Sequence, residues 1–209
     1  KHLILFGVNK LDESKEKFYN SMVVINNNFE IIQSYNKQKL VPFGEFLPYE
    51  SFFTSLGLKK ITEGYGSFLK GEKNNNLLID KLNIIPLICY EVIFTDFIQK
   101  SDPNSNLIIN ISEDGWFGQS IGPDQHFAKS IFRSIENNTF FLRSTNKGVS
   151  AIIDNKGNII KQLKRNEAGN IEFEVPLIKS NKIKNDLIFF ALLITYLFIF
   201  LINKKKNAK

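Results

Sequence analysis

Short apolar runs separated by polar turn residues occupy most of the chain up to residue 175. Runs of four to eight residues rich in Ile, Val, Leu and Phe are typical of β-strands. The segment 107–111 is almost wholly apolar, as expected for a strand that is buried on both faces. The predicted strands are 3–8, 21–25, 29–33, 77–80, 83–88, 107–111, 140–143, 149–154, 159–163 and 171–175.

Two segments have helical spacing instead. The segment 94–100 predicts a short helix. The segment 124–137 predicts a longer one, in which Phe127, Ile131 and Ile135 recur every fourth residue as a core-facing stripe. Strands interleaved with helices indicate an α/β or α+β sandwich of packed layers.

The last apolar segment is longer than the others. Residues 187–202 are apolar apart from Thr195 and Tyr196, and lysines flank both ends. As a helix the segment would span roughly 24 Å, slightly less than the ~30 Å hydrocarbon core of a bilayer. The flanking lysines can reach the interface and make up the difference. We therefore predict a transmembrane helix, with a buried core helix as the alternative.

The composition is that of a globular protein, since 43% of the 209 residues are hydrophobic and 23% are charged. The formal net charge is +6, but the lysines are scattered, and their one dense run, Lys204 to Lys206, follows the apolar segment. This favours a membrane over nucleic acid as partner and predicts a cytoplasmic C-terminus. A single cysteine excludes an internal disulfide. Two histidines without a Cys/His cluster argue against zinc, so we expect neither metal nor cofactor.

Cys89 is a candidate nucleophile. It ends the apolar run 84–88 and is followed by Tyr90 and Glu91. A turn at a strand end exposes a side chain and brings backbone N–H groups close to a developing oxyanion. Taken alone, a single cysteine among apolar neighbours is more often a buried structural thiol.

Two further segments have the composition of shaped loops. Lys37 precedes a block, 40–48, that holds Glu45 among two prolines, a glycine and aromatic residues. Taken alone, Lys37 and Glu45 read as solvated surface residues. Trp116 and Phe117 lie between glycines after the strand 107–111, where they could form a lid or an acyl-binding wall. The alternative is a turn whose tryptophan plugs the edge of the core.

Together these motifs resemble the apolipoprotein N-acyltransferases, membrane members of the nitrilase (carbon-nitrogen hydrolase) superfamily. The motifs are Tyr-x-Lys-x-x-Leu-Val-Pro-Phe-Gly-Glu ending at Glu45, Ile-Cys-Tyr-Glu around Cys89, and Asp-x-Trp-Phe-Gly around Trp116. Further matches surround Gln125-His126, Arg133, Glu136 and Arg143. The resemblance covers nearly the whole chain.

The resemblance implies a nitrilase-like α-β-β-α sandwich and a Glu-Lys-Cys triad. Cys89 matches the nucleophile and Lys37 the lysine, while Glu45 and Glu91 match further active-site carboxylates. Tyr90, Trp116 and Phe117 match the substrate-binding region. The implied division is a catalytic domain over 1–178, a linker over 179–186, a transmembrane helix over 187–202 and a basic cytoplasmic tail over 203–209.

The chain departs from the family pattern in two ways. The catalytic glutamate of the triad would lie upstream of Lys1, as would part of the sandwich and several membrane spans. We therefore expect a C-terminal fragment with little activity of its own. In addition, Glu113-Asp114 stands where the family usually has Asn-Asp.

The implied function is lipoprotein maturation at the bacterial inner membrane, with the catalytic domain on the periplasmic side. An acyl chain would move from a phospholipid, phosphatidylethanolamine in the first instance, through a thioester on Cys89. Its acceptor would be the α-amine of the S-diacylglyceryl-cysteine that begins an apolipoprotein. The alternatives are a membrane-anchored nitrilase-type amidohydrolase and an inactive truncated remnant.

Overall fold

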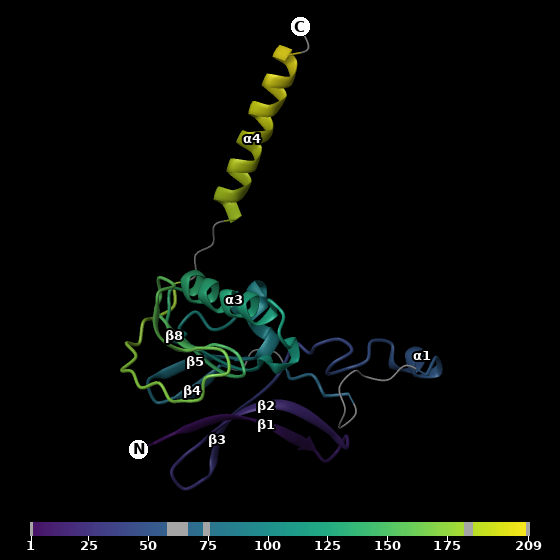
Figure 1. The fold of residues 1–209 in the computed structure, drawn as a ribbon, viewed down its shortest axis with the longest axis vertical. Helices are drawn as coiled ribbons and strands as arrows, with labels where there is room; N and C mark the ends of the chain where they lie inside the picture. The colour runs from purple at the N-terminus through teal and green to yellow at the C-terminus, as the bar shows by residue number, and fades with distance from the viewer. Residues whose placement is uncertain (1, 58–66, 73–75, 182–185, 208–209) are drawn as a thin grey trace.

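In a computed structural model, two β-sheets pack face to face, with a helical layer on the outer side of the larger sheet (Figure 1). The structure describes residues 2–57, 67–72, 76–181 and 186–207. The predicted α/β sandwich is confirmed, with a terminal apolar helix after it.

The smaller sheet is an antiparallel meander of three strands. Strand β1 (Ile4–Asp12) pairs with β2 (Lys17–Ile25), which pairs with β3 (Ile31–Asn36). Strands β1 and β2 run several residues further than their apolar pattern predicts, because they pair with each other along a polar hairpin that ends at Asp12 and Lys17.

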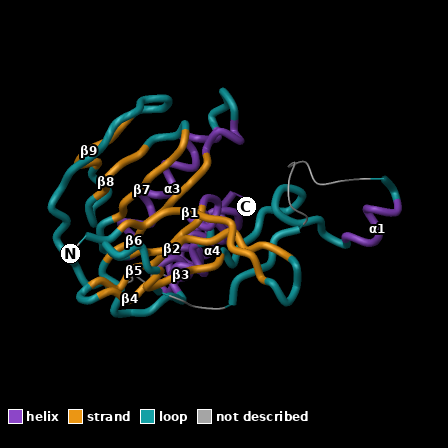
Figure 2. The backbone as a smooth tube through the Cα atoms, turned by 90° about the horizontal axis from the view of Figure 1, so that it is seen from below, coloured by secondary structure: helices purple, strands orange, loops and turns teal. Residues whose placement is uncertain are grey.

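The larger sheet has the strand order β4-β5-β6-β7-β8-β9 (Figure 2). Its centre, β5-β6-β7, is parallel and its outer pairs are antiparallel. The predicted strand over 171–175 is wrong, since that segment runs without regular structure. The strands are β4 (Leu77–Ile79), β5 (Leu82–Ile88), β6 (Leu107–Glu113), β7 (Phe141–Asn146), β8 (Ser150–Ile153) and β9 (Ile159–Leu163).

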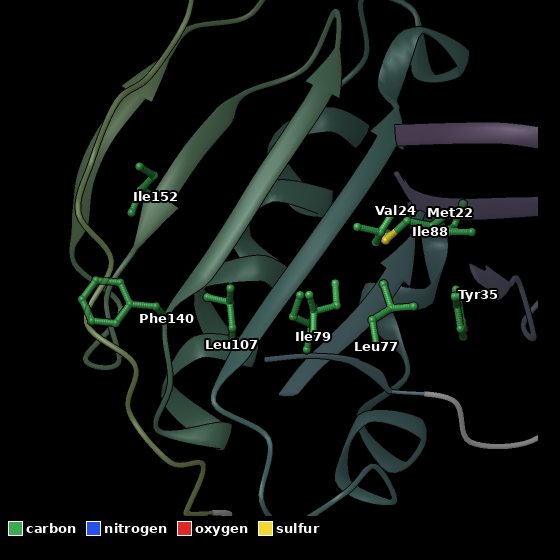
Figure 3. Close-up of a cluster of buried hydrophobic side chains, with 10 residues drawn as sticks. Met22, Val24, Tyr35, Leu77, Ile79, Ile88, Leu107, Phe140 and Ile152 are labelled. Atoms are coloured by element: carbon green, nitrogen blue, oxygen red, sulfur yellow. The ribbon is translucent and has the colours of Figure 1, made fainter. Parts of the chain in front are cut away.

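The core between the sheets is built from alternate residues of both. Met22 and Val24 of β2 and Tyr35 of β3 belong to the same buried cluster as Ile88 and Leu107 of the larger sheet (Figure 3). A second core, with Leu87 and Ile108, lies between the larger sheet and the helices. Strand β5 is therefore buried on both faces, and its last residue leads into the space between the two sheets.

Two short helices follow strand ends, and a longer one covers the larger sheet. The predicted stripe on α3 is only partly correct, because Phe127 and Ile131 pack against the second core whereas Ile135 is 38% exposed. The most buried face of α3 is polar and includes His126 and Arg133. The helices are α1 (Glu50–Ser55), η1 (Cys89–Ile93), α2 (Thr95–Gln99), η2 (Asp114–Phe117), α3 (Gly122–Asn137) and α4 (Asp186–Asn207).

Helix α4 contains the predicted membrane segment. The stretch Leu187–Lys204 has a mean hydropathy of 2.3, none of it is buried, and its length and composition suffice to cross a membrane. The alternative of a buried core helix is therefore wrong. Part of the predicted linker, 182–185, and the last two residues of the predicted tail lie outside the described residues.

Candidate active site

Cys89 lies at the carboxyl end of β5 and is the first residue of η1. Its φ angle of 51° is in the left-handed region, which costs a non-glycine residue about 1–2 kcal/mol. The half-buried thiol lines a cavity of about 670 Å³ between the two sheets. The predicted turn at a strand end is confirmed, and the cysteine is accessible rather than sealed in the core.

Glu91, two residues later, is completely buried and anchors the loop that carries Lys37. Its Oε1 accepts hydrogen bonds from the Tyr35 hydroxyl at 2.8 Å and from the backbone N–H groups of Gln38 and Lys39 at 2.7 and 3.0 Å. Its Oε2 accepts from the N–H of Ile88 at 2.8 Å. Glu91 thus ties β3, the loop after it and the end of β5 together.

Burial dominates the electrostatics of Glu91. It raises the pKa of this carboxyl, although the hydrogen bonds from Ile88, Lys39, Gln38 and Tyr35 act in the opposite direction. Burial and the neighbouring Glu91 charge also raise the pKa of the Tyr35 hydroxyl. The Glu91 carboxylate accepts from the residue before Cys89 and is not among the described residues that line the cavity.

Lys37 and Glu45 form an ion pair at the cavity. The Nζ of Lys37, a residue that is only 1% exposed, lies 2.8 Å from both Oε1 and Oε2 of Glu45. Glu45 also accepts from Asn20 Nδ2 at 2.8 Å and from the Val41 N–H at 2.9 Å. Glu45, Asn20 and Cys89 line the same cavity. The loop of the Pro-Phe-Gly-Glu block therefore brings a buried ammonium group to the site.

The predicted substrate residues separate into two groups. Trp116 lines the cavity and is 66% exposed, which excludes the alternative in which it plugs the core. Phe117 packs against the His126 ring, with ring centroids 5.5 Å apart. Tyr90 makes an edge-to-face contact with Phe94 at 5.8 Å. Of these three side chains, only Trp116 is placed on the cavity wall.

A second buried polar cluster lies beneath Cys89, and sequence reasoning assigned it no role. Asp114 Oδ2 lies 2.7 Å from the guanidinium of Arg143, and its Oδ1 lies 3.0 Å from His126 Nδ1. The other ring nitrogen, Nε2, lies 3.2 Å from the carbonyl oxygen of Cys89. Because a carbonyl oxygen only accepts, Nε2 is the hydrogen-bond donor in this contact, while Nδ1 also lies 3.0 Å from the guanidinium of Arg143. Asn110, which also contacts Arg143, donates to the same oxygen at 3.4 Å.

This cluster is arranged around an ionised carboxylate. Burial by itself raises the pKa of Asp114, but the close contact with His126 and the positive charge of Arg143 outweigh it, so its pKa lies below the usual value. The chain of contacts from Arg143 through Asp114 and His126 ends on the backbone of the strained cysteine. The only signal in the sequence was the match of these three residues to the family motifs.

The family profile described as carbon-nitrogen hydrolase matches residues 1–184, which include all of this site. The chain belongs to the carbon-nitrogen hydrolase family.

The resemblance to apolipoprotein N-acyltransferases is confirmed by proteins of that name. The one from Rickettsia typhi is 38% identical over 211 residues, covering 96% of this chain and 41% of its own length. The one from Brucella melitensis is 37% identical over 166 residues, covering 79% of this chain and 31% of its own length. The chain thus spans less than half the length of these relatives.

Solved structures share the fold at low sequence identity. Nit3 of Saccharomyces cerevisiae, a nitrilase-superfamily member, matches with a TM-score of 0.56 and 18% identity, over 78% of this chain and 55% of that one. An amidase from Nesterenkonia sp. AN1 matches with a TM-score of 0.56 and 16% identity, over 79% and 60%. At these identities the likeness concerns the carbon-nitrogen hydrolase fold alone.

The cavity itself combines an apolar wall with a polar end. Its apolar lining comes from Leu5 and Phe6 of β1, from Ile109 and Ile111 of β6, and from Trp116. The polar end is lined by Ser112, Glu113, Ser144 and Asn146. A hydrocarbon chain fits the wall, and a polar group fits the end, so the site is suited to an amphipathic ligand whose reacting carbon reaches Cys89.

Proposed function

We propose that this chain forms the thioester-bearing part of a lipoprotein N-acyltransferase, with Cys89 as acyl carrier. The observation that carries the proposal is a strained, accessible cysteine in an apolar-walled cavity, beside a buried ammonium group and in a chain that ends in a membrane-compatible helix. Relatives named apolipoprotein N-acyltransferase support the choice of reaction.

The first step acylates Cys89. A carboxylate base takes the thiol proton, and the sulfur attacks an ester carbonyl of a phospholipid. The C–S bond forms, the ester C–O bond breaks, and the departing lyso-phospholipid oxygen takes the proton back. Lys37 and a backbone N–H stabilise the oxyanion of the tetrahedral intermediate.

The base in this step is a carboxylate outside the described site. Glu45 already accepts hydrogen bonds from Lys37, Asn20 and Val41, so both of its oxygens are engaged in holding the loop and the Lys37 ammonium group. The family pattern supplies a glutamate upstream of Lys1 for this role. Glu45 then fixes the Lys37 ammonium, and Glu91 fixes the loop that carries it.

The second step transfers the acyl chain to an amine. The α-amine of an N-terminal S-diacylglyceryl-cysteine attacks the thioester carbon, the C–N bond forms, and the C–S bond breaks. The amine attacks in its neutral form, after its ammonium form has released one proton to water; on attack it loses one further proton, which the thiolate of Cys89 regains. Because two substrates use one site in turn, ping-pong kinetics are expected.

The membrane supplies the donor. Helix α4 keeps the cavity next to a phospholipid, here taken as phosphatidylethanolamine, and so raises the effective donor concentration. The lysines 204–206 in the last turn of α4 support a cytoplasmic C-terminus in the bacterial inner membrane, with the catalytic domain on the periplasmic side.

The test is the mass of the full protein that carries this chain, after incubation with phosphatidylethanolamine vesicles. We expect one acyl adduct, absent from Cys89→Ala, that is lost when a free-amine lipopeptide is added. An adduct that water removes at the same rate without the lipopeptide contradicts acyl transfer and indicates an amidohydrolase-type enzyme. The 209-residue chain alone is expected to show little turnover, and no adduct in the full protein would indicate an inactive remnant.

A further inference from the structure

Glu113 is a cavity carboxylate that the steps above leave without a role. It is the last residue of β6 and continues the face of that strand which carries Ile109 and Ile111, because side chains of a strand alternate between its faces. The cavity wall thus changes from apolar to anionic along β6. From Ile109 to Glu113 the strand advances by roughly 13 Å.

The charge of Glu113 is not neutralised in the way that the charge of Glu45 is. Among the described residues that line the cavity, Glu45 and Glu113 are the charged ones. Glu45 is paired with the ammonium of Lys37 at 2.8 Å. Among the residues that the structure describes, the donors to Glu113 are neutral: the Gly115 N–H at 2.7 Å and Asn146 Nδ2 at 2.6 Å.

No cation within the described part of the chain forms an ion pair with Glu113. The stem of Lys147 passes close to Gly115, but its ammonium stays outside ion-pair distance of the carboxylate. Each oxygen of a carboxylate can accept a second hydrogen bond, so Glu113 keeps capacity for a ligand. The polar end of the cavity therefore carries a net negative charge.

We propose that Glu113 binds the ammonium group of the acyl acceptor. This inference rests on the proposed function, because it names the part of the same cavity that receives the second substrate. An N-terminal amine is largely protonated when it arrives at neutral pH, and a partly desolvated carboxylate attracts it. The apolar residues before Glu113 on β6 suit lipid chains attached next to that amine, so the acceptor class is an amphipathic molecule with a free amine beside its acyl chains.

The hydrogen bonds of Glu113 also explain why the site tolerates a charge there. Its Oε1 caps the first turn of η2, and its Oε2 holds Asn146 at the end of β7. The carboxylate is thereby fixed at the junction of two strand ends and of the turn that presents Trp116. A preorganised carboxylate loses little entropy when it binds an ammonium group.

Equilibrium binding separates this proposal from catalysis. The full protein with Cys89→Ala is titrated with two fluorescent S-diacylglyceryl-cysteine peptides, one with a free α-amine and one with that amine acetylated. We expect Cys89→Ala to bind the free-amine peptide about tenfold more tightly. Adding Glu113→Gln, which keeps an oxygen for the Gly115 cap, should abolish the preference, whereas Glu113→Asp should retain it.

The charge-matched control is Glu30→Gln in the Cys89→Ala protein. Glu30 is exposed in the turn between β2 and β3, and its Oε2 contacts Asn26. This control is expected to keep the tenfold preference. Equal affinity for the two peptides in Cys89→Ala, or a preference that survives Glu113→Gln, overturns the proposal. The proposed function is judged separately, by the acyl adduct of the wild-type protein.

Discussion

The two sides of the Cys89 turn are held by buried carboxylates of opposite electrostatic character. Glu91 is surrounded by neutral donors, and burial raises its pKa. Asp114 is paired with Arg143 and contacts His126, and its pKa is lowered. Both residues are almost completely buried, so the difference comes from the partners. At Asp114 the contact with His126 and the charge of Arg143 together reverse the effect of burial on the pKa, whereas the neutral donors around Glu91 only reduce that effect.

The two carboxylates also hold different parts of the turn. The Glu91 side fixes the chain entering the turn and the loop that presents Lys37. The Asp114 side fixes the carbonyl of Cys89 itself, through His126. A strained residue stays in its conformation only when its surroundings determine it from several directions. The contacts of Glu91 and those of Asp114 together hold the backbone of Cys89 in its left-handed conformation.

The largest expected effect comes from Asp114→Asn. The amide has the same shape, but the change leaves the guanidinium of Arg143 buried without its anion, which typically costs about 3–5 kcal/mol. We expect a large fall in the thermal unfolding midpoint of the full protein in detergent. A midpoint within experimental error of the wild type would show that Arg143 is not dependent on this ion pair.

A smaller loss is expected from the matched change Glu91→Gln. No cation loses its partner, but the new NH₂ group must face backbone N–H donors, which costs about 1–3 kcal/mol. The same melting experiment measures it, and acylation of Cys89 should slow as well because the Lys37 loop loosens. If Glu91→Gln destabilises the protein more than Asp114→Asn, the loss of stability is not determined by whether the carboxylate has a cationic partner.

The pH dependence of stability should have opposite signs on the two sides. The folded pKa of Asp114 is lowered, so its stabilisation is complete above the unfolded value of about 3.9 and is lost as pH falls through the folded pKa. The folded pKa of Glu91 is raised, so its contribution is most favourable below the unfolded value of about 4.3 and declines as pH rises through the folded pKa.

Chemical unfolding between pH 3 and 7 measures these two contributions. As pH falls, the stability difference between wild type and Asp114→Asn should shrink, while that between wild type and Glu91→Gln should grow. Parallel changes in the two differences would contradict the assigned directions.

The smallest effect is expected from His126→Phe. The ring volume is nearly kept, and the loss is that of the hydrogen bond to the Cys89 carbonyl and of the contact with Asp114, about 1–2 kcal/mol of stability. We expect the rate of Cys89 acylation to fall by about tenfold, since the thiol is less well oriented. Asn137→Ala, a buried polar change at the far end of α3, serves as a control, because it should reduce stability and leave the acylation rate per folded molecule unaltered.

The sequence by itself determined the secondary-structure elements that follow from local hydrophobic periodicity. Strand spacing predicted nine of the segments that form strands, and it failed at 171–175, where apolar residues pack on the core without pairing to a neighbour. The length and flanks of 187–202 likewise predicted α4. Cys89 was found from its place at a strand end, and the motif order gave the family.

Only the tertiary structure decided what each polar side chain faces. The partners of Glu91 come from positions up to 56 residues away, and His126 reaches Cys89 across 37 residues. Such contacts depend on how the sheets and α3 pack, which local periodicity does not specify. Glu91 and Glu45 look alike as loop carboxylates in the sequence. In the folded chain Glu91 is completely buried, whereas Glu45 and Glu113 line the cavity.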